Sequence, residues 1–211
     1  MNARDPGWIG RLREQVAGEV LVAEPLARYS TYRIGGPATV LLPGNAADVA
    51  QAVRVAGGAG VGWFALGLGS NLLLPDEGLE LLVIRLGRGL DRIEPLGEGR
   101  WRLGAGLPQP QAARRTAEAG QSGLHRFVGV PGTVGGGVYM NAGCHGGDWS
   151  EVVRSVTVVD RHGADRILPR AAIPFGYRES GLADQVVVEV EVGLVDADPV
   201  AIQSEVAELF R

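Results

Sequence analysis

The sequence predicts an α+β protein, because strand-like and helix-like segments follow one another without the regular alternation of a doubly wound sheet. Short apolar or alternating runs typical of strands occur at 20–26, 38–42, 61–66, 81–86, 90–95, 100–104, 152–160 and 186–195. Helical spacing of apolar residues occurs at 8–16, 45–56, 108–119 and 198–210. Two glycine-rich segments, 67–71 and 129–147, separate these elements and are the second observation on which the interpretation rests.

In the first part of the chain, the strongest local signals surround one helix and one strand. Asn45 precedes a segment that places Val49, Val53 and Ala56 on one face and ends at Gly57-Gly58, so a capped amphipathic helix is expected. The nearly all-apolar run 61–66 is then a short buried strand. It leads directly into the first glycine-rich segment.

The later part of the chain predicts two hairpins and a final helix. Segments 90–95 and 100–104 form a pair joined at Gly97-Glu98-Gly99, and 152–160 turns back at 161–164. Asp198 is expected to cap a helix that has Pro199 in its first turn.

Composition and charge exclude several classes of protein. The 211 residues carry a formal net charge of −4 with both signs interspersed, which argues against a nucleic-acid partner and against a basic membrane-binding surface. Cys144 is the single cysteine, so neither an internal disulfide nor an all-cysteine metal site is expected. Residues 1–15 lack the apolar core of a secretory signal, and no apolar run approaches the roughly 20 residues that span a bilayer. We therefore expect a cytoplasmic protein with no membrane association.

The two glycine-rich segments are the candidate binding site. Segment 129–147 holds eight glycines in nineteen residues, a costly composition unless the backbone turns sharply or approaches a ligand. Segment 67–71 (Gly-Leu-Gly-Ser-Asn) lacks the third glycine and the following helix of a dinucleotide fingerprint, but a strand followed by such residues suits an anion cradle of backbone N–H groups. Our hypothesis is that both segments hold one large cofactor; the alternative is a pair of tight turns.

Arg178 is the candidate catalytic residue. It lies among aromatic and glycine residues in Phe175-Gly176-Tyr177-Arg178-Glu179-Ser180, where a guanidinium offers a planar positive fork to a carboxylate or carbonyl. The alternative is a surface ion pair with Glu179 or another acid.

The remaining reactive side chains give weaker signals. His125 and His145 flank the second glycine-rich segment, where either a position at the edge of a cofactor or an ordinary polar contact is open to them. No group of residues has metal-ligand spacing, so no metal is predicted. Adjacent Cys144 and His145 point apart, against a thiol nucleophile, and Tyr139 and Met140 are interpreted as packing residues.

Four motifs, in order, resemble a known family. They are Ser30-Thr31-Tyr32-Arg33-Ile34-Gly35-Gly36-Pro37, Gly67-Leu68-Gly69-Ser70-Asn71-Leu72-Leu73, Val130-Pro131-Gly132-Thr133-Val134-Gly135-Gly136 with Tyr139-Met140-Asn141-Ala142-Gly143, and the Phe175–Ser180 segment. From about Leu21 onward the chain resembles UDP-N-acetylenolpyruvoylglucosamine reductases (UDP-N-acetylmuramate dehydrogenases), the flavoenzymes of peptidoglycan precursor synthesis, which links them to cell wall biogenesis, cell shape and cell division.

The resemblance implies a two-lobed FAD-binding domain of the vanillyl-alcohol-oxidase (PCMH) type. It implies that NADPH reduces FAD, and that hydride then passes to the enolpyruvyl double bond of UDP-N-acetylenolpyruvoylglucosamine, whose carboxylate Arg178 would hold while stabilising the developing charge. Carried over by position, the FAD-binding residues are Gly67, Leu68, Gly69, Ser70, Asn71, Val130, Pro131, Gly132, Thr133, Gly135, Gly136, Asn141 and Gly143.

The resemblance also predicts a division of the chain. Residues 1–20 are expected to be a helical extension, 21–88 and 89–197 the two FAD-binding lobes, and 198–211 the start of a helix leading to a third, substrate-binding domain. The family's third-domain motifs, including its proton-donating serine or cysteine and a glutamate, have no counterpart here, so poor turnover by the chain alone is expected. His125 and His145 also stand where the family has Glu and Tyr.

Two alternatives remain at this point. The chain is a non-catalytic flavin-binding module, completed by a separate chain carrying the third domain, or it is another oxidoreductase of the same fold acting on a different molecule. The Phe175–Ser180 motif argues against the second.

Overall fold

The computed structural model describes residues 7–209, which divide into two compact units. Unit 1 takes the chain up to Leu90 together with 158–166 and 184–186. Unit 2 takes 91–157, 167–183 and the chain from Val187 onward. The predicted lobe boundaries at 21–88 and 89–197 stay a prediction.

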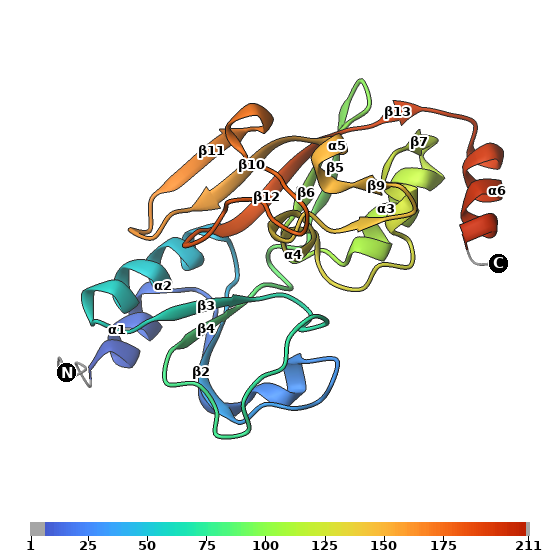
Figure 1. Ribbon diagram of the computed structural model, residues 1–211. Coiled ribbons are helices and arrows are strands. Elements are labelled where there is room, and N and C mark those ends of the chain that lie inside the picture. Colours follow the sequence, from blue (N-terminus) through green and yellow to red (C-terminus); the bar gives the residue numbers. More distant parts are fainter. Residues whose placement is uncertain (1–6, 210–211) are drawn as a thin grey trace. The chain divides into compact units, whose positions relative to one another are not determined.

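Unit 1 is built on a four-stranded sheet (Figure 1). The spatial order is β1 (Glu19–Pro25), β2 (Pro37–Leu42), β4 (Leu82–Arg85) and β3 (Trp63–Leu66). β1 runs antiparallel to β2, whereas β2, β4 and β3 are parallel to one another. The two outer parallel strands, β2 and β3, are connected through α2 (Ala46–Gly58), and the carboxyl ends of the three parallel strands therefore share one edge.

The sequence explains why the helices of unit 1 form where they do. The Asn45 side chain accepts a hydrogen bond from the Asp48 N–H at 3.0 Å, and Val49, Val53 and Ala56 on the apolar face of α2 are all buried. The predicted capped helix is thus confirmed. The predicted first helix is confirmed as α1 (Trp8–Gln15), which buries Trp8 and Leu12 and packs against α2.

A separate apolar cluster forms around the strands of unit 1. Leu26, Val40, Leu66 and Val83 pack together there, with the partly buried Tyr29 against them. Leu26 and Tyr29 belong to η1 (Leu26–Tyr29), a short 3₁₀ helix directly before the Ser30–Pro37 motif. This cluster fixes the backbone on which the first glycine-rich segment lies.

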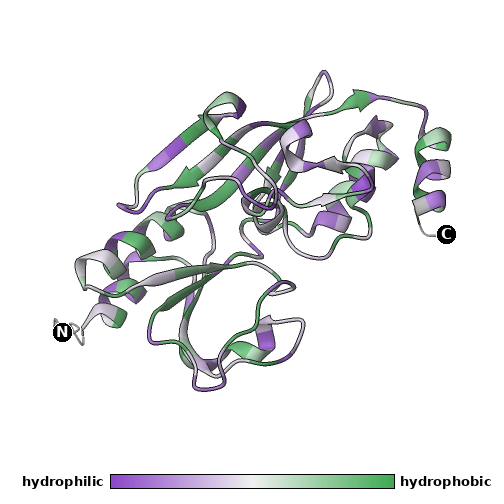
Figure 2. Cartoon of the chain, in the orientation of Figure 1, coloured by the Kyte–Doolittle hydropathy of each residue, from purple (hydrophilic) through white to green (hydrophobic). Residues whose placement is uncertain are grey.

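Unit 2 is built around a five-stranded sheet. The order is β11 (Asp165–Pro169), β10 (Val153–Val159), β12 (Val186–Gly193), β6 (Arg100–Gly104) and β5 (Ile93–Gly97). One end of each of β10, β11 and β12 is counted with unit 1. β12 is mostly apolar, as Figure 2 shows by its green colour, and it buries five valines. Both predicted hairpins are confirmed in position: β5 pairs antiparallel with β6, and β10 lies beside β11.

Helices and short hairpins complete unit 2. The helical elements are α3 (Gln109–Glu118), η2 (Leu124–Phe127), α4 (Val134–Tyr139), α5 (Trp149–Val152), η3 (Arg170–Ala172) and α6 (Pro199–Leu209). Two two-residue strand pairs accompany them, β7 (Gln121–Ser122) with β13 (Val195–Asp196), and β8 (Gly143–Cys144) with β9 (Gly147–Asp148). Asp198 accepts a hydrogen bond from the Val200 N–H at 3.0 Å, so the predicted cap of α6 is confirmed.

The second glycine-rich segment differs from the loop that its composition predicted. It contains a short helix, α4, and the β8–β9 hairpin. Thr133 begins α4 by accepting a hydrogen bond from the Gly136 N–H at 3.3 Å. The interpretation of Tyr139 as a packing residue is wrong, because its side chain at the end of α4 is 44% exposed.

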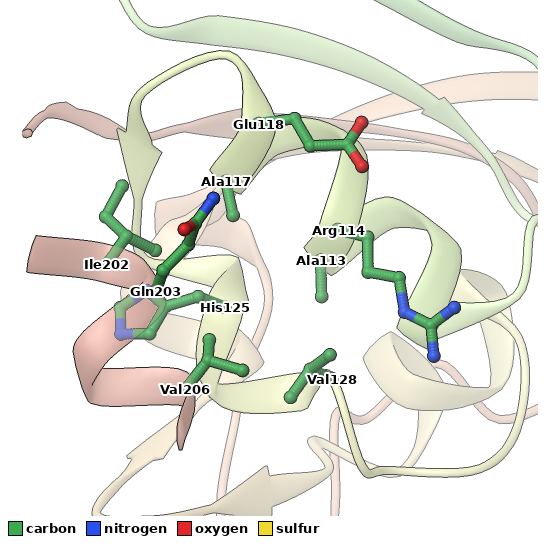
Figure 3. A pocket seen from close by; sticks show the side chains of 9 residues that line it. All are labelled: Ala113, Arg114, Ala117, Glu118, His125, Val128, Ile202, Gln203 and Val206. Carbon is green, nitrogen blue, oxygen red and sulfur yellow. The ribbon is translucent and has the colours of Figure 1, made fainter. Parts of the chain in front are cut away.

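α6 packs on α3 and η2 of unit 2 around a small cavity, shown in Figure 3. Buried Ile202 of α6 lines this cavity together with Val206, Ala113 and Val128. Within residues 7–209, no helix combines the length and apolar character required to cross a membrane.

Candidate functional site

Segment 67–71 follows β3 at the edge where the parallel strands of unit 1 end. The Gly69 carbonyl accepts a hydrogen bond from the Thr31 N–H at 3.2 Å, which ties the segment to the Ser30–Pro37 motif. Gly69 has φ +60°, and a Cβ there would lie 2.4 Å from the Tyr29 carbonyl oxygen. Only glycine fits this contact, so the position is set by the packing of two motifs that are far apart in the sequence.

The backbone N–H groups of this segment are not used in hydrogen bonds within the described protein. Among the described residues, none of the five N–H groups from Gly67 to Asn71 donates to a protein acceptor. The side chains of Leu68 and Asn71 are exposed, and Ser70 is half-buried. A row of unpaired N–H groups at the carboxyl edge of parallel strands is a suitable cradle for a phosphate group.

The Ser30–Pro37 motif is held rigidly beside this cradle. The buried Ser30 hydroxyl donates to the Ile34 carbonyl at 3.0 Å and accepts from the Ile34 N–H at 3.2 Å. The Gly36 N–H donates to the Pro75 carbonyl at 2.8 Å. The motif therefore acts as a scaffold for segment 67–71, a structural role that its sequence alone did not indicate.

Arg85 is a residue at the same edge that sequence reasoning missed. It is the last residue of β4, pairs in register with Leu66 of β3, and places its guanidinium carbon 5.9 Å from the centre of the Tyr29 ring. Burial lowers the pKa of Arg85 from its usual value. A charged residue inside the otherwise apolar run 81–86 was the signal that could have identified it.

The second glycine-rich segment presents a smaller set of free donors in unit 2. Thr133 is buried and forms an isolated antiparallel β-bridge with Pro108. Neither the Thr133 N–H nor the Gly132 N–H donates to an acceptor within the described chain. Val130 and Pro131 lead into this turn, and the Pro131 carbonyl accepts from the Gln109 side chain at 3.0 Å. The structure is thus compatible with a ligand acceptor at Gly132 and Thr133.

The three consecutive glycines of α4 are not all required for the same physical reason. A Cβ at Gly135 would lie 2.8 Å from the Ala105 Cβ, and one at Gly137 would lie 2.4 Å from Trp149 Nε1. Protein packing alone therefore requires glycine at these two positions. Gly136 lies between them and is exposed, and a Cβ there would meet no atom closer than 3.5 Å. Protein packing does not require glycine at this position, and the exposed backbone there leaves room for a ligand to lie close to α4.

Two buried side chains join the second glycine-rich segment to the Phe175–Ser180 motif within unit 2. The Asn141 amide donates to the Gly176 carbonyl at 2.9 Å and its oxygen accepts from the Ser150 N–H at 3.0 Å. The Ser180 hydroxyl donates to the Tyr139 carbonyl at 2.7 Å. Asn141 and Ser180 are 5% and 2% exposed, so these bonds are shielded from water and hold the two motifs in fixed register.

Arg178 lies at the corner of a tight turn that this arrangement supports. Gly176 and Glu179 pair across the turn, with the Gly176 N–H donating to the Glu179 carbonyl at 2.9 Å, and Arg178 adopts φ +57°. Its Nη1 donates to the Gly143 carbonyl at 3.2 Å, and its guanidinium carbon lies 5.5 Å from the centre of the exposed Tyr177 ring. Within the described residues Arg178 forms no ion pair with Glu179 or any other acid. Its charge is therefore available to an anionic ligand.

The histidines and the cysteine take up different positions. His125 is buried; its Nδ1 accepts from the Gly123 N–H at 3.2 Å and its Nε2 lies 2.9 Å from a Glu205 carboxylate oxygen, so it links η2 to α6 near Ile202 (Figure 3). His145 is exposed at the turn of the β8–β9 hairpin, with φ +52°. Cys144 is partly buried in that hairpin. No cluster of three or more metal-binding side chains occurs in the part of the chain that the structure describes.

Comparison with known proteins agrees with this geometry. The model of a family described as FAD binding domain matches residues 37–165. The fold also matches 4-ethylphenol oxidase from Gulosibacter chungangensis, with a TM-score of 0.69 at 15% identity over 94% of this chain and 45% of that one. The chain therefore has the α+β fold of FAD-binding domains of the vanillyl-alcohol-oxidase (PCMH) type, as predicted.

Relatives at higher identity define the family more narrowly. UDP-N-acetylenolpyruvoylglucosamine reductase from Phenylobacterium zucineum (strain HLK1) is 38% identical over 96% of this chain and 68% of its own length, and the Caulobacter sp. (strain K31) reductase is 43% identical over 92% and 64%. The crystal structure of the Thermus caldophilus reductase matches with a TM-score of 0.82 at 32% identity, over 92% of this chain and 69% of that chain. The chain belongs to the UDP-N-acetylenolpyruvoylglucosamine reductase family. It spans 64% and 65% of the lengths of its two Caulobacter relatives.

Proposed function

We propose that this chain binds FAD and provides the flavin site for the NADPH-dependent reduction of UDP-N-acetylenolpyruvoylglucosamine to UDP-N-acetylmuramate in the cytoplasm. The observation that carries the proposal is that both units have a glycine-rich segment whose backbone N–H groups have no acceptor within the described protein. Gly67 to Asn71 offer five such groups, and Gly132 and Thr133 offer two more. Membership of a family of flavoprotein reductases supports the choice of cofactor.

The residues present fit FAD in chemical type. The diphosphate of FAD is an anion that accepts hydrogen bonds, and the flavin ring is a flat group with acceptor atoms along its edge. Free N–H groups suit both, and the exposed Gly136 allows a flat group to lie close to α4. When bound, FAD supplies hydride transfer between NADPH and substrate.

Arg178 is proposed to bind the carboxylate of the substrate. Its guanidinium is exposed, is not neutralised by an acid within the described residues, and is held by Gly143 and Tyr177. Reduction of the enolpyruvyl double bond places negative charge next to that carboxylate, so a fixed positive group there stabilises the transition state more than the ground state. Asn141 and Ser180 keep the turn that carries Arg178 in place.

Cofactor uptake is the first test of this proposal. The purified chain is titrated with FAD, and binding is followed by the quenching of flavin fluorescence and by the visible absorbance of the washed complex. Saturable uptake of one FAD per chain is expected. A colourless protein that takes up no FAD would overturn the proposal.

Turnover is the second test. NADPH oxidation that requires UDP-N-acetylenolpyruvoylglucosamine is measured for the chain and for its Arg178→Ala and Arg178→Lys variants, all loaded with FAD. If turnover occurs, Arg178→Ala is expected to lower kcat by roughly 10²–10³-fold, the scale of removing one stabilising donor, without loss of FAD. Absence of turnover by the FAD-loaded chain is the result expected where the groups of the predicted third domain are needed, and it is equally the result expected of a flavin-binding module completed by a separate chain.

A further inference from the structure

We propose that Arg85 binds the diphosphate of FAD, completing with a cation the cradle of backbone N–H groups at residues 67–71. The inference rests on the proposed function, because it assigns a new residue to the cofactor site. It concerns residues of unit 1 alone.

The position of Arg85 at the strand edge is the first argument. β3 and β4 are parallel and Leu66 is paired with Arg85, so the chain leaves the sheet into segment 67–71 next to the residue that ends β4. Tyr29 contacts both features: its ring faces the Arg85 guanidinium, and its carbonyl oxygen packs against Gly69. The guanidinium and the glycine-rich segment are therefore neighbours on one rigid support.

The unused donors of Arg85 are the second argument. A guanidinium has five N–H donors, and in the described chain Nη1 donates to the Leu86 carbonyl whereas the buried Nε has no acceptor. No carboxylate forms an ion pair with Arg85 among the described residues. That Nε is shielded from any ligand, so the donors left for an acceptor from outside the chain are on the terminal nitrogens of this half-buried side chain.

The chemistry of this edge selects the diphosphate over the other parts of FAD. A half-buried arginine beside a row of N–H groups provides donors and positive charge but no acceptor, which suits an anion. Burial disfavours the charged form of Arg85 and lowers its pKa, and an anion beside the guanidinium would offset that cost. The flavin ring and the adenine base carry no such charge.

The test separates the diphosphate from the rest of the cofactor. Kd values for FAD and for riboflavin, which lacks the diphosphate, are measured by fluorescence titration, and ADP is used as a competitor of FAD. The variants are Arg85→Met, which removes the charge, and Arg85→Lys, which keeps it. Arg88→Met is the matched control, because Arg88 is an exposed arginine three residues further along the chain.

Arg85→Met is expected to raise the Kd for FAD by about 10- to 100-fold, the value of a charge-assisted hydrogen bond, and to raise the inhibition constant of ADP in parallel. The Kd for riboflavin should stay unchanged, Arg85→Lys should lose less FAD affinity than Arg85→Met, and Arg88→Met should bind like the parent.

Three outcomes would contradict the inference. FAD binding that does not depend on Arg85 would overturn it while leaving the proposed function intact. A parallel loss of FAD and riboflavin affinity in Arg85→Lys, which retains charge and is the variant better suited to fold, would assign Arg85 a purely structural role at Leu86. Absence of FAD uptake by the parent chain would overturn both this inference and the proposed function.

Discussion

Ser180 is the residue whose contribution to the candidate site is simplest to isolate. Replacing it with alanine removes the hydrogen bond that the buried Ser180 hydroxyl donates to the Tyr139 carbonyl, so Ser180→Ala is expected to lower the free energy of unfolding by about 0.5–1.5 kcal/mol. Urea titration followed by circular dichroism measures this change. The control is Ser204→Ala, which removes an exposed hydroxyl bonded to the Val200 carbonyl of α6 and should change stability by no more than about 0.5 kcal/mol. Equal effects of the two substitutions would show that the link between the motifs is weak.

The lowered pKa of Asp160 predicts how the stability of the folded state changes at acidic pH. Backbone N–H groups of Ala164 and His162 and the Arg166 side chain lower its pKa from 3.8 to about 2. Because the folded-state pKa is below the unfolded one, the stabilisation is fully present above pH 3.8 and is lost as the pH falls toward about 2. Urea titrations from pH 6 to pH 2 should therefore show a smaller decline for Asp160→Asn than for the parent.

The control for this prediction is Asp165→Asn, at an exposed carboxylate a few residues further along. It should decline with pH like the parent chain. If Asp160→Asn and the parent lose stability in parallel between pH 4 and pH 2, the turn at 160–164 does not depend on this charge.

The individual residues also show what the sequence could and could not predict. The Asn45 and Asp198 caps were predictable because a cap and its helix are neighbours in the chain. Arg85 and the support that Tyr29 gives to Gly69 were not, because both depend on strand pairing between distant segments. The role of Ser180 likewise required knowing that 139–143 and 175–180 are in contact.

At the scale of elements, two neighbouring glycines of α4 allow the effect of packing to be measured apart from the effect of ligand binding. Gly135→Ala is expected to cost about 1–3 kcal/mol of stability, because its Cβ would overlap Ala105. Gly136→Ala meets no such overlap and should stabilise the helix by up to about 1 kcal/mol. If a flat cofactor lies against α4 as proposed, Gly136→Ala nevertheless weakens FAD binding. Unfolding and FAD titrations on both variants measure the two effects, and unchanged FAD affinity in Gly136→Ala would argue against contact at this position.

The elements were predicted more completely than the second glycine-rich segment. Periodicity identified the strands and the long helices because their patterns extend over several turns or pleats. α4 escaped detection because glycine is a poor helix former, and its close packing against Ala105, Gln109 and Trp149 depends on segments that are distant in the sequence.

For the whole molecule, FAD should act as a stabilising ligand. A ligand at 100 times its Kd stabilises the folded state by about 2.7 kcal/mol, which corresponds to a rise in Tm of roughly 5–10 °C for a chain of this size. Thermal unfolding with FAD and with riboflavin at equal concentration measures the shift, and riboflavin should give the smaller one. A Tm that saturating FAD does not change would contradict the proposed site.

Unit 1 is assembled from three separate segments of the chain, which matters for the order in which it is synthesised on the ribosome. This unit includes 158–166 and 184–186 besides the first 90 residues, so its last part is synthesised only when residue 186 of 211 has been added. The four strands of its sheet all lie within the first 90 residues, so they leave the exit tunnel before 158–166 and 184–186 are synthesised. The apolar cluster around Leu26, Val40 and Val83 also belongs to those first 90 residues, so the sheet and its cluster can form on the ribosome before the final segments of unit 1 are added.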